Sequence, residues 1–150
     1  MERAFPTAAE YAAGRARHGA LAVVDLQAEQ AGVTGDYDNR VLLDVGDHCM
    51  RLAVFEGEYR WHRHPESDEL FLVVAGTLEI DIEGGERLTL APWQAVVIPA
   101  GTVHALGAGV MVYEIQQPSD VTFRLDDWGR VDAAGNPREM HLDAGYRAAR

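Results

Sequence analysis

Residues 57–76 read GEYRWHRHPESDELFLVVAG, and this stretch determines how we interpret the rest of the chain. His62 and His64 are two residues apart on a predicted strand, so their side chains project to the same side. Residues 65–68 supply a turn, and the next predicted strand begins at Glu69. A hairpin of this length brings Glu69 beside the two histidines on a neighbouring strand. The stretch therefore predicts three metal ligands on two adjacent strands.

A fourth candidate ligand follows in the segment PAGTVH, residues 99–104. Its proline and glycine form a tight turn, and His104 comes at the start of another predicted strand. Three imidazoles and one carboxylate suit a divalent transition ion, zinc first, with manganese, iron, nickel or cobalt as alternatives. Calcium and magnesium prefer all-oxygen ligands. The predicted metal site is His62, His64, Glu69 and His104, whereas we interpret His18, His48 and His141 as surface or hydrogen-bonded histidines.

Short β segments, separated by Gly and Pro turns, follow one another from about residue 39. In TLEIDIEGG (77–85), Leu78, Ile80 and Ile82 occupy one face and acidic residues the other. The predicted segments are RVLLDVG, CMRLAVFEG, YRWHRH, ELFLVVAG, TLEIDIEGG, ERLTLAP, QAVVIPAG and GVMVYEIQQ. Strands at this spacing predict an all-β fold, an antiparallel sandwich or barrel.

Helix signals are confined to the flanks. Thr7 and Glu10 have capping-box spacing, which predicts a short N-terminal helix to about Ala16. A second short helix or turn is expected in DLQAEQAG (25–32). We divide the chain into an N-terminal helical or extended segment packed on the barrel (1–38), a β-barrel (39–118) and a polar C-terminal extension (119–150).

The composition argues against several partners and one type of catalytic chemistry. The formal net charge is −11, which argues against nucleic acid and anionic membranes as partners. All 13 basic residues are arginine, which excludes lysine Schiff-base chemistry. Cys49 is the single cysteine, so we expect a reducing, cytoplasmic location and interpret Cys49 as a core residue. We find neither a signal-peptide pattern nor an apolar stretch of membrane-spanning length.

The motif in residues 57–76, a glycine, HxH, a glutamate and a closing glycine, resembles the first motif of the cupins. PAGTVH resembles their second motif, although Trp93 stands where a glycine commonly opens it and Ala108 replaces its terminal asparagine. The resemblance covers about residues 40–118. It implies a cupin double-stranded β-helix, or jelly roll, with the metal inside, and a homodimer. We interpret the aromatic residues Trp61, Phe71 and Trp93 as core or dimer-interface residues, with pocket lining as the alternative.

A second resemblance extends beyond the barrel. Residues 98–130, IPAGTVHALGAGVMVYEIQQPSDVTFRLDDWGR, are similar to the C-terminal half of short bacterial type I mannose-6-phosphate isomerases. The resemblance implies a zinc ligand at His104, a charge-neutralising role for Arg124, and a sugar or sugar phosphate as substrate. That family carries Gln-x-His where this chain has its histidine pair, and a lysine where this chain has Ser67. Its members are about twice as long.

An aldose–ketose isomerase needs a metal to stabilise negative charge and a base to move a proton between neighbouring carbons. Glu114 and Tyr113 are both candidates for the base, and strand alternation directs only one of them inward. Our catalytic candidates are Glu114 and Arg124. Two of the histidines with Glu69 would also form the iron site of a non-haem dioxygenase, the leading alternative. A non-catalytic cupin that binds a small molecule is the second alternative.

Overall fold

The computed structural model describes residues 15–33, 35, 37–64, 66–117, 122–124 and 139–140, and of residues 59, 60, 108, 122–124 and 139–140 only the backbone. The elements are α2 (Leu26–Ala31), β1 (Tyr37–Val45), β2 (His48–Arg63), β3 (Glu69–Ile82), β4 (Leu88–Leu90), β5 (Ala95–Ile98), β6 (His104–Gln116), β7 (Thr122–Arg124) and β8 (Glu139–Met140). Within this described part, no helix has the length and apolar character needed to cross a membrane. Almost all of the predicted helix at 7–16 lies outside the described residues, and Arg15 and Ala16 are not helical.

The strands form one antiparallel sheet that closes into a barrel. Its order is β4-β3-β6-β2-β7-β8, while β1 pairs with β2 and β5 pairs with β3. Strand β6 lies between β2 and β3 and pairs with both along most of its length. This arrangement confirms the all-β fold that the alternating pattern predicted.

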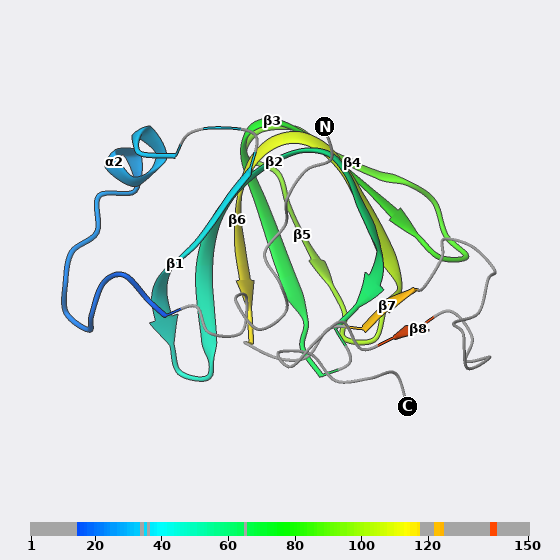
Figure 1. The fold of residues 1–150 in the computed structure, drawn as a ribbon, viewed down its shortest axis with the longest axis horizontal. Helices are drawn as coiled ribbons and strands as arrows, with labels where there is room; N and C mark the ends of the chain where they lie inside the picture. Colours follow the sequence, from blue (N-terminus) through cyan, green and yellow to red (C-terminus); the bar gives the residue numbers. More distant parts are fainter. Residues whose placement is uncertain are drawn as a thin grey trace.

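Strands β2, β3 and β6 are long because they bend rather than end. Gly57 and Gly76 adopt positive φ angles of 87° and 79° midway along β2 and β3. A Cβ atom on Gly76 would lie 1.9 Å from the carbonyl oxygen of Gly109 on β6, so no other residue fits there without a shift of the backbone. Figure 1 shows the three strands arching over the top of the barrel, with their ends descending on both sides. The predicted segments broke at Gly57 and at Gly76. These two breaks are wrong, because the pairing with β6 continues across both glycines.

The barrel interior has two parts. Beneath the bend, Phe55, Leu78, Leu106 and Val110 belong to one apolar cluster with little or no solvent exposure, which we call the apex. At the open end, where the strand ends meet, a group of polar side chains is buried beside apolar ones. We call this end the mouth, and its side chains are His62, His64, Glu69, His104 and Glu114.

A second apolar layer covers the outside of the sheet. Leu42, Leu52 and Tyr113 form its buried centre, and Leu26 of α2 packs against it. Asp25 caps this helix by accepting a hydrogen bond from the backbone N–H of Ala28 at 3.2 Å. The short helix expected in residues 25–32 is thereby confirmed.

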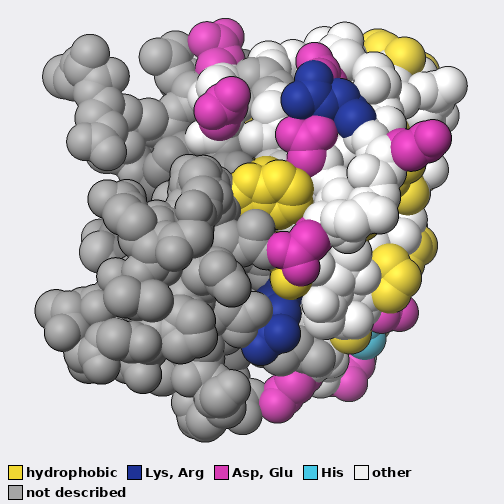
Figure 2. Space-filling model, turned by 90° about the vertical axis from the view of Figure 1, so that its right-hand side faces the viewer, with side chains coloured by type: hydrophobic (Ala, Val, Ile, Leu, Met, Phe, Trp, Pro, Cys, Tyr) yellow, Lys and Arg dark blue, Asp and Glu magenta, His cyan; other side chains and the backbone are white. Residues whose placement is uncertain are grey.

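Carboxylate side chains are spread over the face of the barrel shown in Figure 2, and on its described part arginines form only isolated spots. On the β3–β4 hairpin, Arg87 bridges two acidic residues of β3. It donates to Asp81 at 2.7 Å and also pairs with Glu79. These are exposed ion pairs, which contribute little to stability.

Candidate metal centre

The structure brings together the four side chains that the sequence predicted as metal ligands. One ligand atom of each lies within 4.8 Å of those of the other three, and all four side chains are buried. His62 and His104 are directly opposite on the adjacent strands β2 and β6. Their ring centroids are 4.3 Å apart, and His62 also contacts His64 edge-on at 5.3 Å.

Glu69 joins the histidines by a different route from the hairpin that we expected. Strands β2 and β3 do not pair with each other, because β6 lies between them. Along the sheet, Glu69 is opposite Gln116, at the far end of β6 from His104. The arch brings these two ends together, so that Glu69 Oε1 lies 3.4 Å from Nε2 of both His64 and His104. The contact therefore crosses the barrel interior.

The hydrogen bonding of His104 tests whether a cation fits this cluster. Its Nδ1 lies 2.9 Å from the carbonyl oxygen of Thr102, which can only accept, so Nδ1 carries the proton. In a neutral ring, Nε2 then presents a lone pair toward Glu69 Oε1, another acceptor. Within the described part of the chain, both atoms are buried and lack a hydrogen-bond partner.

A positive ion would satisfy both atoms. Two ligands that are each about 2.1 Å from an ion, at a tetrahedral angle, lie about 3.4 Å apart, close to the separation found here. A histidine fixed through its other nitrogen by a backbone carbonyl is also typical of metal sites. The cluster could therefore hold a divalent transition ion.

Electrostatics favour an ionised carboxylate at Glu69. Burial acts to raise the pKa of this carboxyl, but the protonated forms of the neighbouring His64 and His104 outweigh it, and the pKa of Glu69 lies well below its usual range. A cation held between the neutral histidines would lower the pKa of Glu69 in the same direction. An anionic carboxylate is the form that binds a cation. The structure therefore presents Glu69 in the state that metal binding requires.

The structure decides which of the two adjacent base candidates faces inward. Glu114 is buried and points into the mouth, on the same face of β6 as Val112. Tyr113 points outward into the second apolar layer, where its hydroxyl accepts a hydrogen bond from Gln30 at 2.7 Å. Burial, together with the charge of Glu69, raises the pKa of Glu114 to about 8, although Arg51 acts in the opposite direction.

Sequence reasoning missed two polar side chains of the barrel interior, Arg51 and Gln116, which are 4% and 1% exposed. Arg51 lies opposite Glu114 on β2, and its guanidinium donates to Asn39 at 3.0 Å. The available signal was the arginine inside the apolar run CMRLAVF, since alternation gives Arg51 the same face as the buried Ala53.

The second catalytic candidate, Arg124, lies on β7, beside the end of β2. Its neighbour Phe123 is opposite His62 in the backbone register. The backbone of Arg124 is therefore close to a predicted metal ligand. Its side chain lies outside the described part of the structure, so its charge-neutralising role stays a prediction.

Three other residues singled out in the sequence lie outside the His/Glu cluster. Cys49 is buried, and burial raises the pKa of its thiol, as expected for a core residue. Phe71 is part of the apolar core and contacts His104 edge-on, with ring centroids 6.5 Å apart. Trp93 is 74% exposed and has a φ of 67°, the left-handed conformation that glycine favours. Trp93, which stands where the cupin motif commonly has a glycine, thus adopts a conformation that glycine tolerates best.

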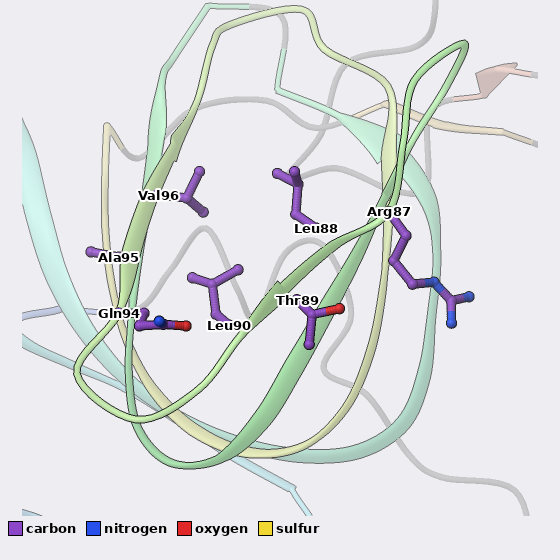
Figure 3. A pocket seen from close by; sticks show the side chains of 7 residues that line it. All are labelled: Arg87, Leu88, Thr89, Leu90, Gln94, Ala95 and Val96. Carbon is purple, nitrogen blue, oxygen red and sulfur yellow. The ribbon is translucent and has the colours of Figure 1, made fainter.

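A separate cavity of about 560 Å³ opens between β4 and β5. In Figure 3, Leu88, Leu90 and Val96 point into the space between these strands, whereas Arg87 is directed outward. No predicted ligand or catalytic residue is among the side chains that line it. It is thus separate from the His/Glu cluster.

Comparison with known proteins agrees with this architecture. Residues 49–109 match the cupin domain family. The uncharacterised protein YdbB of Bacillus subtilis is 53% identical over 66 residues, which cover 44% of this chain and 58% of YdbB. Mannose-6-phosphate isomerase ManA of the same organism is 46% identical over 67 residues, which cover 41% of this chain and only 21% of ManA. The similarity to the isomerases is therefore restricted to part of both chains.

Solved structures agree on the fold. A cupin-2 domain-containing protein from Shewanella frigidimarina superposes with a TM-score of 0.56 at 27% identity, covering 68% of this chain and 95% of that protein. The match supports the double-stranded β-helix, or jelly roll, as the fold of the barrel. The match includes almost the whole of that protein but only about two thirds of this chain.

Proposed function

The chain carries a cupin domain, and on this premise we propose that it is a metal-dependent isomerase of a small sugar or sugar phosphate. The predicted metal ligands are His62, His64, Glu69 and His104. The predicted catalytic residues are Glu114 and Arg124. The partial similarity to mannose-6-phosphate isomerases supports the reaction class.

One observation carries the proposal: Glu114 is buried at the mouth, beside the His/Glu cluster. Glu69 and Glu114 are the only buried carboxyl groups among the residues that the structure describes. Glu69 faces two histidines and is suited to hold the ion, which leaves Glu114 as the group that can exchange a proton with a substrate. The two carboxyl groups thus have separate roles.

The chemistry follows from these positions. When bound, a divalent ion supplies positive charge that polarises a carbonyl group and stabilises an enediolate. The carboxylate of Glu114 removes the proton from the carbon next to the carbonyl and delivers it to the carbonyl carbon, while the hydroxyl proton passes from the neighbouring oxygen to the former carbonyl oxygen. Arg124 would hold the anionic part of the substrate, since a guanidinium binds phosphate with two parallel hydrogen bonds. The proton returns to the substrate, so no other reactant is consumed.

Ser67 separates this chain from the isomerases that it resembles. It stands where those enzymes carry a lysine, and it is buried, with its hydroxyl donating to the carbonyl oxygen of Asp68 at 2.7 Å. The same hydroxyl accepts from the backbone N–H of Gln117 at 2.9 Å. Ser67 therefore does not supply the positive charge of that lysine, and we expect a substrate preference different from that of mannose-6-phosphate isomerase.

The proposal is tested by incubating untagged protein, loaded in turn with each candidate ion, with free and phosphorylated aldoses and measuring ketose formation. We expect His104→Ala to lose both the ion and the activity. Glu114→Gln should keep the ion and lose the activity, because an amide cannot accept the proton. If the wild-type protein binds none of the ions, or if Glu114→Gln is as active as wild type, the proposed function is wrong.

The oxidative alternative uses the same side chains. Two histidines and Glu69 match the donors of a non-haem iron dioxygenase, which would leave open positions for oxygen. Stoichiometric iron, with substrate-dependent oxygen consumption, would favour this function over the isomerase. Tight sugar binding without turnover would favour the non-catalytic alternative.

We also propose that the natural ion is zinc, that the protein is a homodimer, and that it is located in the cytoplasm. Zinc fits three nitrogen donors and one oxygen donor. Metal analysis of the purified protein tests the first proposal, and sedimentation equilibrium tests the second.

A further inference from the structure

The segment between His64 and Glu69 is tied to the turn before His104 by hydrogen bonds that the sequence did not predict. The backbone N–H of Ala100 donates to Oδ1 of Asp68 at 2.8 Å. The backbone N–H of Gly101 donates to the carbonyl oxygen of His64 at 2.8 Å. Two hydrogen bonds thus connect a segment that carries two predicted ligands to the turn that precedes a third.

Ser67 links the same segment to a second part of the barrel. Its hydroxyl donates to the carbonyl oxygen of Asp68 and accepts from the backbone N–H of Gln117. Gln117 directly follows β6, the strand that begins at His104 and carries Glu114. The segment that precedes Glu69 is therefore hydrogen-bonded both to the turn before β6 and to the residue that follows β6.

We propose that Asp68 is a positioning residue of the metal centre: its carboxylate holds the His64–Glu69 segment against the Pro99–Thr102 turn and so sets the separation of Glu69 from His104. The inference rests on the proposed metal site. Asp68 itself is exposed, and its carboxylate is assigned to the backbone of the turn rather than to the ion. Residues that orient metal ligands without touching the metal typically contribute about ten- to a hundredfold in metal affinity.

Three substitutions separate the position of this acceptor from its charge. Asp68→Asn keeps an oxygen that can accept from Ala100 but removes the charge. Asp68→Glu keeps the charge but moves the acceptor by one methylene group. Asp68→Ala removes both. Asp25→Ala is the matched control, because Asp25 is also an exposed aspartate that accepts from a backbone N–H, but at the start of α2.

The experiment measures the affinity of each full-length variant for Zn²⁺ and Co²⁺ by competition with a chromophoric chelator. The visible absorption bands of the Co²⁺ complex and the thermal stability of the metal-free protein are recorded in parallel. We expect Asp68→Ala to bind about ten- to a hundredfold more weakly, with altered Co²⁺ bands. Asp68→Asn should stay within a few-fold of wild type, Asp68→Glu should fall between these two, and Asp25→Ala should match wild type in affinity.

Two results would overturn the inference while leaving the metal site intact. The first is an Asp68→Ala affinity equal to that of wild type. The second is an affinity that follows charge, with Asp68→Glu normal and Asp68→Asn as weak as Asp68→Ala. A wild-type protein that binds neither ion would refute the proposed function, and the positioning role with it.

Discussion

The inward side chains of β6 change character along the strand while keeping the same face. Leu106, Val110 and Val112, in its middle, belong to the apolar cluster that we call the apex. His104 begins the strand and Glu114 lies near its end, and both are buried at the mouth. Alternation thus decides which side chains of β6 are buried. The position along the bent strand decides whether a buried side chain has apolar or polar neighbours.

The difference teaches where a barrel of this kind can accommodate polar chemistry. At the apex, the pairing of β6 with β2 and β3 continues across Gly57 and Gly76, so a buried polar side chain would find few free backbone partners. At the mouth, turns supply free carbonyl and N–H groups, such as the Thr102 oxygen that fixes His104. We therefore expect substitutions at the apex to affect stability and substitutions at the mouth to affect metal binding.

The largest effect should come from Gly76→Ala at the bend. The new Cβ atom would lie 1.9 Å from the Gly109 carbonyl oxygen, in a backbone conformation with φ of 79°. We expect the free energy of unfolding to fall by more than about 4 kcal/mol, measured by urea denaturation, or the barrel not to fold. Gly84→Ala is the control, because Gly84 has a φ of 75° but no atom within 4 Å of the added Cβ. It should cost only about 1–2 kcal/mol, and equal losses in both variants would contradict the steric explanation.

Leu78→Ala should come next, because Leu78 is fully buried in the apolar core. The cavity should lower the free energy of unfolding by about 2–5 kcal/mol. The affinity of the folded variant for Zn²⁺, measured by titration, should stay at the wild-type value. A loss of affinity as large as the loss of stability would remove the distinction between apex and mouth. Val97→Ala, on a side chain that is 51% exposed, should change stability by less than about 0.5 kcal/mol.

The stability gained on metal addition should depend on the mouth and not on the apex. An ion present at about a hundred times its dissociation constant raises the free energy of unfolding by about 2.7 kcal/mol. We expect this gain, measured as a rise in the thermal midpoint, in wild type and in Leu78→Ala. His104→Ala should show no gain at that ion concentration. A normal gain in His104→Ala would mean that the ion binds elsewhere.

A small effect of opposite sign, a gain in stability, should come from Trp93, which lies outside both regions. Its φ of 67° is unfavourable for a side chain with a Cβ atom, and its ring is mostly exposed. Trp93→Gly should therefore raise the free energy of unfolding by about 0.5–1 kcal/mol, the relief of the left-handed conformation less the added freedom of the unfolded chain. Trp93→Ala keeps the Cβ atom and should show no gain. Equal stabilisation in both variants would exclude the backbone explanation.

The sequence predicted the four clustered side chains, the all-β fold and the short helix at residues 25–32. Local spacing was sufficient for these because HxH on a strand and a histidine after a turn each constrain nearby geometry. It did not predict that Glu69 reaches His104 across the barrel. That contact depends on Gly57 and Gly76 acting as bends within strands. The sequence does not distinguish a glycine that bends a strand from one that ends it in a turn.

Other parts of the site needed the fold before they could be identified. The choice between Glu114 and Tyr113 required the face of β6 to be known, because neighbouring residues on a strand differ only in direction. Asp68 was interpreted as part of a turn, and its bond to Ala100 joins residues 32 positions apart. Such long-range contacts leave no periodic signal in a single sequence.

The central place of β6 has a consequence for the motion of the site. Strand β6 is paired on both sides, with β2 and with β3, and it carries His104 and Glu114. Amide hydrogens in a strand that is paired on both sides exchange with solvent only through large openings of the sheet. The backbone that bears these two side chains should therefore be among the last in the barrel to exchange hydrogen for deuterium. Any adjustment to a substrate would then fall to the turns around the mouth, while β6 acts as a fixed frame.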